Sequence, residues 1–323
     1  MGLSRRNFLK GAAAGGAVAA CAATATAPAD ARENKALPPK AVGLLYDSTL
    51  CVGCKACVVA CREANGTHPE FSADEKLWDS PLDISGYTLN VIKVYADGTA
   101  DHKDQEKDGF AFVKKSCMHC VDPSCVSVCP VSAMQKDPET GIVRHDPSAC
   151  IGCRYCVAAC PFGVPRFSWD TPFPRIRKCE LCSPRQAEGK IPACAEVCPT
   201  GATLFGPVAA LRDEAGRRQG LAAGQVTTFA RKTVGSSDVH EKAIPTYVPH
   251  IYGSTEMGGT QLLMLAGVPF EKLGYPPLRD RSYAAESETI QESLYKGMVG
   301  PVVLLGGLLY AVHKHTKNDH EED

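Results

Sequence analysis

Sixteen of the seventeen cysteines in this 323-residue chain lie between residues 51 and 198. They form four groups, and the most compact reads CIGCRYCVAACP over residues 150–161. Such a loop can wrap three corners of an iron–sulfur cluster, whose ligands are thiolates that converge from several directions. The groups are Cys51, Cys54, Cys57 and Cys61; Cys117, Cys120, Cys125 and Cys129; Cys150, Cys153, Cys156 and Cys160; Cys179, Cys182, Cys194 and Cys198.

The last cysteine of each group cannot reach the cluster that the tight loop wraps. In two-cluster ferredoxins this cysteine binds the other cluster. Proline follows Cys129, Cys160 and Cys198, and proline is favoured in the first turn of a helix, so we expect these thiolates at the start of short helices. Arg62 replaces the proline after Cys61. We expect Arg62 to alter the local start of a helix more than the ligation.

Three other kinds of cysteine site fit the spacing less well. Structural zinc needs two pairs per metal and leaves the third and fourth cysteines unexplained. Disulfides suit the local density of cysteine, but neighbours in a C-x2-C-x2-C series seldom meet disulfide geometry. A redox-active C-x-x-C pair would stand alone within a βαβ pattern, which is absent. The alternative of another class is an exported binding module stapled by disulfides or zinc, and iron and sulfide analysis would distinguish it.

Composition excludes some functions. The formal net charge is −1 and the hydrophobic content is 44%, so the chain has enough apolar residues for a core and lacks the basic surplus of a nucleic-acid-binding protein. We find no nucleophile–base set and no phosphate-binding loop. The sequence therefore predicts no catalytic residues.

The N-terminus predicts export. Residues 4–10 contain the pair Arg5-Arg6 and precede an Ala/Gly-rich run at 11–27, which together are typical of a twin-arginine signal peptide, here residues 1–31. This route carries proteins that are already folded, often with cofactors inserted. Cys21 lies in a segment that loosely resembles a lipoprotein processing box, so its lipidation stays open as an alternative.

The remaining patterns predict an α+β fold. Residues 87–95 and 110–113 favour paired strands, and 137–141 a turn into a short strand at Ile142-Val143. Further on, we expect a helix at 209–218, an extended segment at 245–252, and an apolar run at 262–270 that is too short to cross a bilayer and is buried against a neighbour. The cysteine-rich domain spans 32–206, and 207–293 forms a cysteine-free extension.

The C-terminal part predicts a membrane anchor. Residues 297–312 carry no charge, and with their flanks they give a transmembrane helix at 294–313, bounded by Lys296 and Lys314. A buried C-terminal helix is the alternative. Lys314 and Lys317 place the tail, residues 314–323, in the cytoplasm, which agrees with export of the bulk of the chain.

Taken together, these motifs resemble the four-cluster ferredoxin subunits of membrane-associated respiratory oxidoreductases, and within them the HybA-type iron–sulfur subunits of [NiFe] hydrogenase-2. The resemblance covers nearly the whole chain. It runs through LYDSTLCVGCKACV (45–58), KKSCMHCVDPSCVSVCPVSA (114–133), GCRYCVAACPFGVP (152–165), KCELC (178–182), YVPHIYG (247–253), GGTQLLMLAGVPFE (258–271), LYKGM (294–298) and TKNDH (316–320).

The resemblance implies tandem bacterial-ferredoxin-like modules, each with two clusters, because the family pairs the first group with the fourth and the second with the third. Since all sixteen positions are cysteine, it implies four [4Fe–4S] clusters. The implied ligand sets are Cys51, Cys54, Cys57 and Cys198 (set 1); Cys179, Cys182, Cys194 and Cys61 (set 2); Cys117, Cys120, Cys125 and Cys160 (set 3); Cys150, Cys153, Cys156 and Cys129 (set 4).

The resemblance also implies a non-catalytic subunit that relays electrons. They would pass from the small and large subunits of a hydrogenase to a multi-span membrane subunit that reduces quinone. The chain would lie on the periplasmic side of the inner membrane, with residues 207–293 as a docking surface bearing exposed aromatic and apolar runs. The alternative is the same relay serving a molybdopterin oxidoreductase of the formate, polysulfide or sulfoxide type.

Charged residues near the cysteines allow two interpretations. Positive charge beside a cluster raises its reduction potential, but each residue could equally be a solvated surface group. His119 is expected beside a cluster or exposed and not as a ligand, and His313 and His315 belong to a polar tail. The basic residues are Lys114, Lys115, Arg144, Arg154, Arg177 and Lys178.

Overall fold

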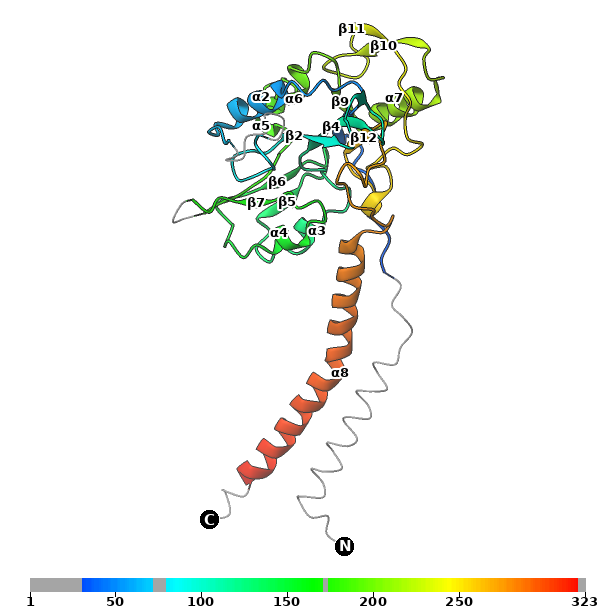
Figure 1. Ribbon diagram of the computed structural model, residues 1–323. Helices are drawn as coiled ribbons and strands as arrows, with labels where there is room; N and C mark the ends of the chain where they lie inside the picture. The colour runs from blue at the N-terminus through cyan, green and yellow to red at the C-terminus, as the bar shows by residue number, and fades with distance from the viewer. Residues whose placement is uncertain (1–30, 72–79, 171–173, 319–323) are drawn as a thin grey trace. The chain divides into compact units, whose positions relative to one another are not determined.

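A computed structural model of the protein describes residues 31–71, 80–170 and 174–318, with side chains up to residue 313 (Figure 1). Its contacts divide the chain into two compact units. One unit is Asn34–Ala284, which contains the sixteen grouped cysteines, and the other joins Ala285–Asp323 with Met1–Glu33. The predicted twin-arginine motif and Cys21 lie outside the described residues.

The main sheet of the larger unit joins distant parts of the chain. It consists of β1 (Val42–Asp47), β9 (Thr203–Pro207) and β12 (Leu262–Leu265), in the order β12-β1-β9. β1 runs parallel to β12, with Leu44 opposite Leu262, and antiparallel to β9. The apolar run at 262–270 is therefore buried in this chain's own core, not against a neighbour. The sheet also crosses the boundary that we expected between residues 206 and 207.

A second sheet contains the predicted strand pair. β2 (Val91–Ala96) lies antiparallel to β4 (Gly109–Lys115), and the short β3 (His102–Lys103) pairs with the other edge of β4. β2 begins later than the expected 87–95. The reason is a turn in which the Ser85 hydroxyl accepts hydrogen bonds from the backbone N–H groups of Tyr87 and Thr88.

Three hairpins complete the strands of the larger unit: β5 (Met134–Lys136) with β6 (Val143–His145), β7 (Arg166–Phe167) with β8 (Ile176–Arg177), and β10 (Val226–Ala230) with β11 (Val239–Ala243). The first contains the predicted turn. The Asp137 carboxylate accepts hydrogen bonds from two backbone N–H groups, and Gly141 adopts φ +69°. Such side-chain acceptance and a left-handed glycine are typical turn features.

The helices near the cysteines are short. They are α2 (Ala56–Asn65), α3 (Ser124–Ser127), α4 (Tyr155–Ala159), α5 (Ser183–Ala187) and α6 (Ala193–Glu196). Figure 1 shows two groups, with α2 beside α6 in one and α3 beside α4 in the other, and contacts between these pairs agree. Two helices lie further along: α7 (Val208–Gly220), which confirms the helix predicted at 209–218, and the single turn η2 (Glu256–Gly258).

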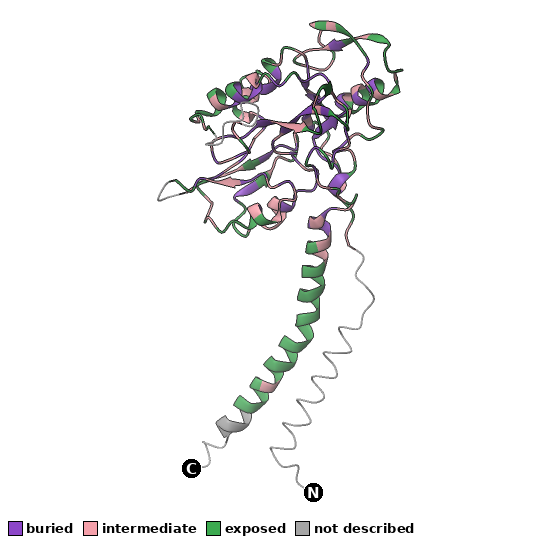
Figure 2. Ribbon diagram, in the orientation of Figure 1, coloured by how far each residue is buried: buried purple, intermediate pink, exposed green. Residues whose placement is uncertain are grey.

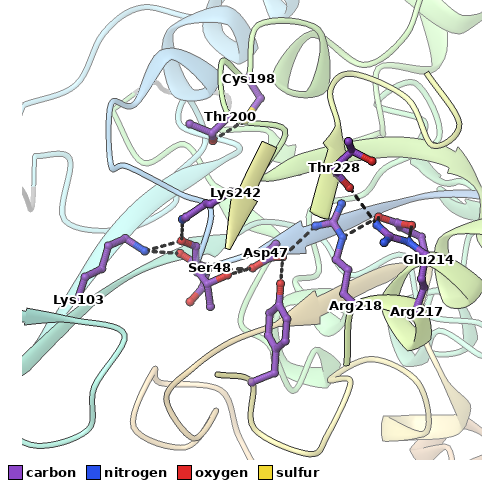
Figure 3. A network of polar contacts seen from close by, with 12 residues as sticks. Asp47, Ser48, Lys103, Cys198, Thr200, Glu214, Arg217, Arg218, Thr228 and Lys242 are labelled. Carbon is purple, nitrogen blue, oxygen red and sulfur yellow. Dashed lines mark hydrogen bonds and ion pairs between the residues drawn. The ribbon is translucent and has the colours of Figure 1, made fainter. Parts of the chain in front are cut away.

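A buried polar network ties α7 to the main sheet (Figure 3). The Asp47 carboxylate, at the end of β1, accepts hydrogen bonds from Arg218 Nη1 at 2.9 Å and Tyr247 Oη at 2.7 Å. Arg218 also donates to Glu214 at 2.8 Å, and its guanidinium lies 5.0 Å from the Phe229 ring centroid. Because a buried charge must be paired, this network requires all its partners.

Apolar side chains of the two sheets form the core, seen as purple segments at the centre of Figure 2. Leu44, Tyr46, Val91 and Met264 belong to one buried cluster. Several cysteines lie in the same cluster, among them Cys51, Cys57 and Cys194. The sulfur sites are therefore built into the core instead of being placed on its surface.

The last helix is α8 (Tyr283–Asn318), 36 residues long, of which all but the first two residues belong to the smaller unit. Among the described residues it is the one helix long and apolar enough to cross a membrane, by length and composition. Its apolar side chains are exposed, for example Val303 at 67% and Leu305 at 59%. The helix begins before the expected residue 294, and residues 314–318, predicted as tail, continue it. Residues 319–323 lie outside the described residues.

Candidate metal centres

Cys51, Cys54, Cys57 and Cys198 line one cavity, although the last is 141 positions away from Cys57. The first three come from the loop after β1 and the start of α2, and Cys198 follows α6. Gly53 makes this loop possible. It has φ +67°, and a Cβ atom there would lie 2.4 Å from the Phe112 ring, so a larger residue would not fit.

A second cavity is lined by Cys61, Cys179, Cys182 and Cys194. Cys61 comes from the same helix as Cys57 but from its later turn. The other three come from the loop before α5 and from α6. Lys114 and Asn65 share the cavity, and Asn65 Nδ2 lies 3.6 Å from Cys61 Sγ.

The third cavity is lined by Cys129, Cys150, Cys153 and Cys156. Cys129 follows α3, while the others surround the start of α4. Gly152, between Cys150 and Cys153, has φ +71° and so repeats the turn that Gly53 makes in the first group. Met134 and Ile176 complete the apolar lining.

The last four cysteines also lie near one another. Electrostatic interactions join Cys120 to Cys117, Cys125 and Cys160. Cys160 follows α4, Cys117 and Cys120 come from the segment between β4 and α3, and Cys125 lies in α3. The structure thus brings together the same four sets of cysteines that the resemblance implied.

The four sets follow one another in a single order. Cys57 of set 1 interacts electrostatically with Cys194 of set 2. Cys179 of set 2 interacts in the same way with Cys117 of set 3. Cys125 of set 3 interacts with Cys156 of set 4. Neighbouring sets are therefore close in the order 1, 2, 3, 4.

The closing cysteines do not lie at helix starts, and this expectation was wrong. α3, α4 and α6 each end one or two residues before a closing cysteine, and proline follows that cysteine. A residue before proline is forced toward extended backbone, and Cys160 accordingly has φ −82° and ψ 113°. In α2, Arg62 lets the helix continue through Cys61 to Asn65. Arg62 therefore changes where the helix ends, not where it starts.

The chemistry of these thiols fits a cluster. All sixteen are free of disulfides. Among the described residues, no group of three or more His, Cys, Asp or Glu is placed to hold a single metal ion. Tetrahedral zinc, with Zn–S bonds of about 2.3 Å, would draw four sulfurs toward one point. Here three of the four sets line cavities, which suits a group larger than one ion.

Burial raises the pKa of Cys57 to about 11 and that of Cys61 to about 12. Neighbouring cysteines add to the increase, while the positive charge of Lys114 opposes it. Because metal ligands are thiolates, such sites need bound metal to hold the deprotonated form.

The ends of the series are exposed. Cys54 in set 1 and Cys153 in set 4 are exposed, whereas the cysteines of sets 2 and 3 are buried or partly buried. Apolar side chains beside them are exposed too, with Val52 at 50% and Ile151 at 65%. Sets 1 and 4 are thus the ones that another molecule can approach most closely.

Two of the six basic residues named from the sequence are buried. Lys114 is 0% exposed, and Lys178 donates to the backbone oxygens of Val143 and Cys179. The other four lie nearer the surface in ion pairs or over aromatic rings: Lys115 with Asp83, Arg144 with Asp137, Arg154 over Trp169 and Arg177 over Tyr87.

Sequence reasoning missed Lys136, which interacts electrostatically with Cys120, Cys117 and Cys125. It donates to the backbone oxygen of Cys120 at 3.0 Å and to Gln261 at 2.9 Å. Burial lowers its pKa to about 8, although the cysteines oppose this change. Alternation along β5 could have revealed it, because Lys136 shares the face of the buried Met134.

His119 is buried, so an exposed position is excluded. Its Nδ1 accepts a hydrogen bond from the backbone N–H of Val143 at 3.1 Å. Burial, together with the charges of Lys178 and Lys136, lowers the pKa of His119 well below the usual value. The imidazole is therefore neutral, with its proton on Nε2, and it orders the segment between Cys117 and Cys120.

Comparison with known proteins agrees with this chemistry. A family profile described as a 4Fe–4S dicluster domain matches residues 109–208. The hydrogenase-2 operon protein HybA of Escherichia coli O157:H7 is 47% identical over 325 residues, covering 99% of this chain and 98% of that protein. Two relatives match shorter regions.

The first of these is the iron–sulfur subunit of the nitrate-inducible formate dehydrogenase of Escherichia coli K12. It is 38% identical over 181 residues, covering 56% of this chain and 58% of that subunit. The second is the NrfC homologue of Haemophilus influenzae. It is 38% identical over 205 residues, covering 63% of this chain and 79% of that protein. The match to HybA thus covers nearly the whole chain, whereas these two cover 56% and 63% of it.

Proposed function

Because the chain belongs to the HybA family and is an electron-transfer iron–sulfur subunit, we propose that it links a periplasmic [NiFe] hydrogenase to a membrane subunit that reduces quinone. The clusters, when bound, take up and release single electrons. We further propose that there are four [4Fe–4S] clusters. Sets 1 to 4, as defined above, would supply the ligands.

One observation carries this proposal: cysteines far apart in the sequence line the same cavities. Cys61 and Cys179 are 118 positions apart, yet they share the second cavity. Each of the three cavities has four cysteines, which is the number that a [4Fe–4S] cluster takes. The pairs α2 with α6 and α3 with α4 support two ferredoxin-like modules, each holding two clusters.

The two exposed ends are the proposed contact sites for partner subunits. Cys54 has Val52 and Val59 exposed beside it, and Cys153 has Ile151 and Tyr155. Exposed apolar groups around a functional centre are typical of protein interfaces. These exposed groups support docking at sets 1 and 4. It does not rest on residues 207–293, whose longest apolar run is buried in the core.

The chain is a membrane-associated subunit, and α8 supports a single span at residues 294–313. The twin-arginine pattern supports export of the larger unit to the periplasmic side, with the C-terminus in the cytoplasm. The role that we propose is non-catalytic, in agreement with the sequence, which predicts no catalytic residues.

The decisive experiment compares anaerobic membranes that contain this chain with membranes that lack only this chain. We expect hydrogen to reduce four clusters, seen by electron paramagnetic resonance (EPR), and quinone reduction by hydrogen to require the chain. A preparation with about 16 iron atoms per chain would support four clusters. Iron near zero would contradict the proposal and leave the disulfide- or zinc-stapled binding module.

A second function has support from the formate dehydrogenase subunit that matches over 56% of the chain. In this alternative the same cysteine sets serve a molybdopterin enzyme. Clusters that stay oxidised under hydrogen but are reduced when formate or another donor is added would select it. The choice between the two thus depends on the electron donor and not on the cysteines.

A further inference from the structure

Lys114 is the buried lysine whose ammonium group has no hydrogen-bond partner within the described part of the chain. Its side chain is 0% exposed and lines the cavity of set 2. The other lysines near the cysteines differ. Lys103, Lys136 and Lys178 each donate to backbone oxygens.

The groups that face Lys114 are sulfur atoms. Its strongest electrostatic interactions are with Cys194, Cys57, Cys61 and Cys179, of which three belong to set 2 and Cys57 to set 1. No carboxylate is among these interactions. A buried ammonium group is costly unless an anion or acceptor pairs with it. The cavity also contains Asn90, Ser116 and Glu180, but the cysteines exert the largest electrostatic effect on Lys114 that favours its charge.

The alternation of β4 explains how this lysine reaches the interior. Lys114 and Lys115 are adjacent, so their side chains point to opposite faces of the strand. Lys115 pairs with Asp83 at 2.9 Å, and its side chain is 30% exposed. Tyr275 donates its hydroxyl hydrogen bond to the backbone oxygen of Lys114, which holds the strand at this position.

We propose that Lys114 is the charged partner of the cluster in set 2, donating hydrogen bonds to its sulfur atoms and raising its reduction potential. This inference rests on the proposed ligand sets. A positive charge favours the more negative, reduced state of a nearby cluster, and the low polarity of the interior strengthens the effect.

The effect should differ among the four sets. Set 2 has three cysteines among the strongest interactions of Lys114, and set 1 has one. For Cys156 in set 4, the main causes of the raised pKa are burial and then the neighbouring Cys129, Cys150 and Cys153, and Lys114 is not among them. Lys114 therefore raises the reduction potential of the cluster in set 2 relative to that of the cluster in set 4.

The test uses the whole complex in anaerobic membranes, with Lys114→Met compared with Lys115→Met. Methionine keeps the length and volume of lysine but removes its charge. In a redox titration followed by EPR, we expect one cluster potential to fall strongly in Lys114→Met, a second to fall less, and two to stay unchanged. Lys115→Met should leave all four unchanged. Four unchanged potentials in Lys114→Met would overturn the inference.

Loss of a cluster is a separate outcome that Lys114→Arg resolves. If Lys114→Met contains about four fewer iron atoms per chain, the charge-preserving Lys114→Arg should restore both the iron and the EPR signal. Failure of arginine to restore them would overturn a role based on charge. The wild-type chain provides the reference, because fewer than four clusters there would contradict the proposed function and not the role of Lys114.

Discussion

Cys57 and Cys61 lie one helical turn apart in α2, yet they line different cavities. A single helix thus contributes to two sites. The side chains of residues four apart lie on the same face, one turn above the other. Because Cys57 and Cys61 are one turn apart, the two sets lie close together, and Cys57 interacts electrostatically with Cys194 of the second set.

This arrangement gives a prediction at the scale of single residues. Cys57→Ser and Cys61→Ser should each remove a different EPR signal, despite their proximity. Cys179→Ser should affect the same signal as Cys61→Ser, because both thiols line one cavity. Iron analysis should show a loss of up to about four atoms for each variant, since a thiolate ligand is missing.

Ser183→Ala, next to a cysteine but not lining the cavity, is the control and should keep all four signals. If Cys57→Ser and Cys61→Ser weakened the same signal, the ligand sets proposed here would be incorrect.

At the scale of elements, the length of each helix is matched to the position of its cysteine. α3, α4 and α6 end one or two residues before the closing cysteine, which proline follows. In α2 the helix continues to Asn65, and Gly66 at φ 59° terminates it. The extra turn carries Asn65, whose amide lies near the Cys61 sulfur.

Arg62→Pro should therefore disrupt set 2 although it reproduces the Cys-Pro pair of the other groups. Proline in a helix interior costs about 3 kcal/mol and forces the preceding residue, here Cys61, out of helical backbone. We expect a lower midpoint of thermal unfolding and loss of one EPR signal, both measured on the anaerobic complex.

Arg62→Ala tests whether the arginine side chain itself matters. It keeps the helix and should retain four clusters. Full cluster content and wild-type stability in Arg62→Pro would show that the final turn of α2 is dispensable.

At the scale of the whole molecule, we propose that α8 holds the chain at the membrane. Among the described residues, the apolar side chains of Val302, Val303 and Leu305 in this helix are exposed. A soluble helix rarely exposes so continuous an apolar surface. We therefore propose that lipid or a membrane subunit covers this surface of α8.

Val303→Lys combined with Leu305→Lys should release the chain from membranes. Each lysine near the centre of a span costs about 3 kcal/mol on insertion scales. Fractionation of cells should then show more of the chain in the soluble fraction, with its iron retained, because the cysteines belong to the other unit.

The control is Ser287→Lys, which lies in the polar first part of α8 and should leave membrane attachment unchanged. Unaltered attachment of the double lysine variant would mean that another contact holds the chain, such as docking to a partner or lipidation of Cys21.

The sequence by itself determined the features that depend on local spacing. Cysteines three positions apart already define a cluster-binding loop, because a few residues of backbone set the directions of three thiolates. The same holds for α7, for the turn before β6 and for the apolar helix at the C-terminus. Each of these was predicted from the pattern of residues within a single continuous segment.

Only the tertiary structure decided which distant residues meet. It placed β12 beside β1 and buried a run that looked available for docking. It separated Lys114 and Lys178, which are buried, from basic residues with similar positions in the sequence. It also showed that α3, α4 and α6 end just before their Cys-Pro pairs instead of starting there. Burial arises from the packing of segments more than a hundred residues apart, and no local pattern specifies that packing.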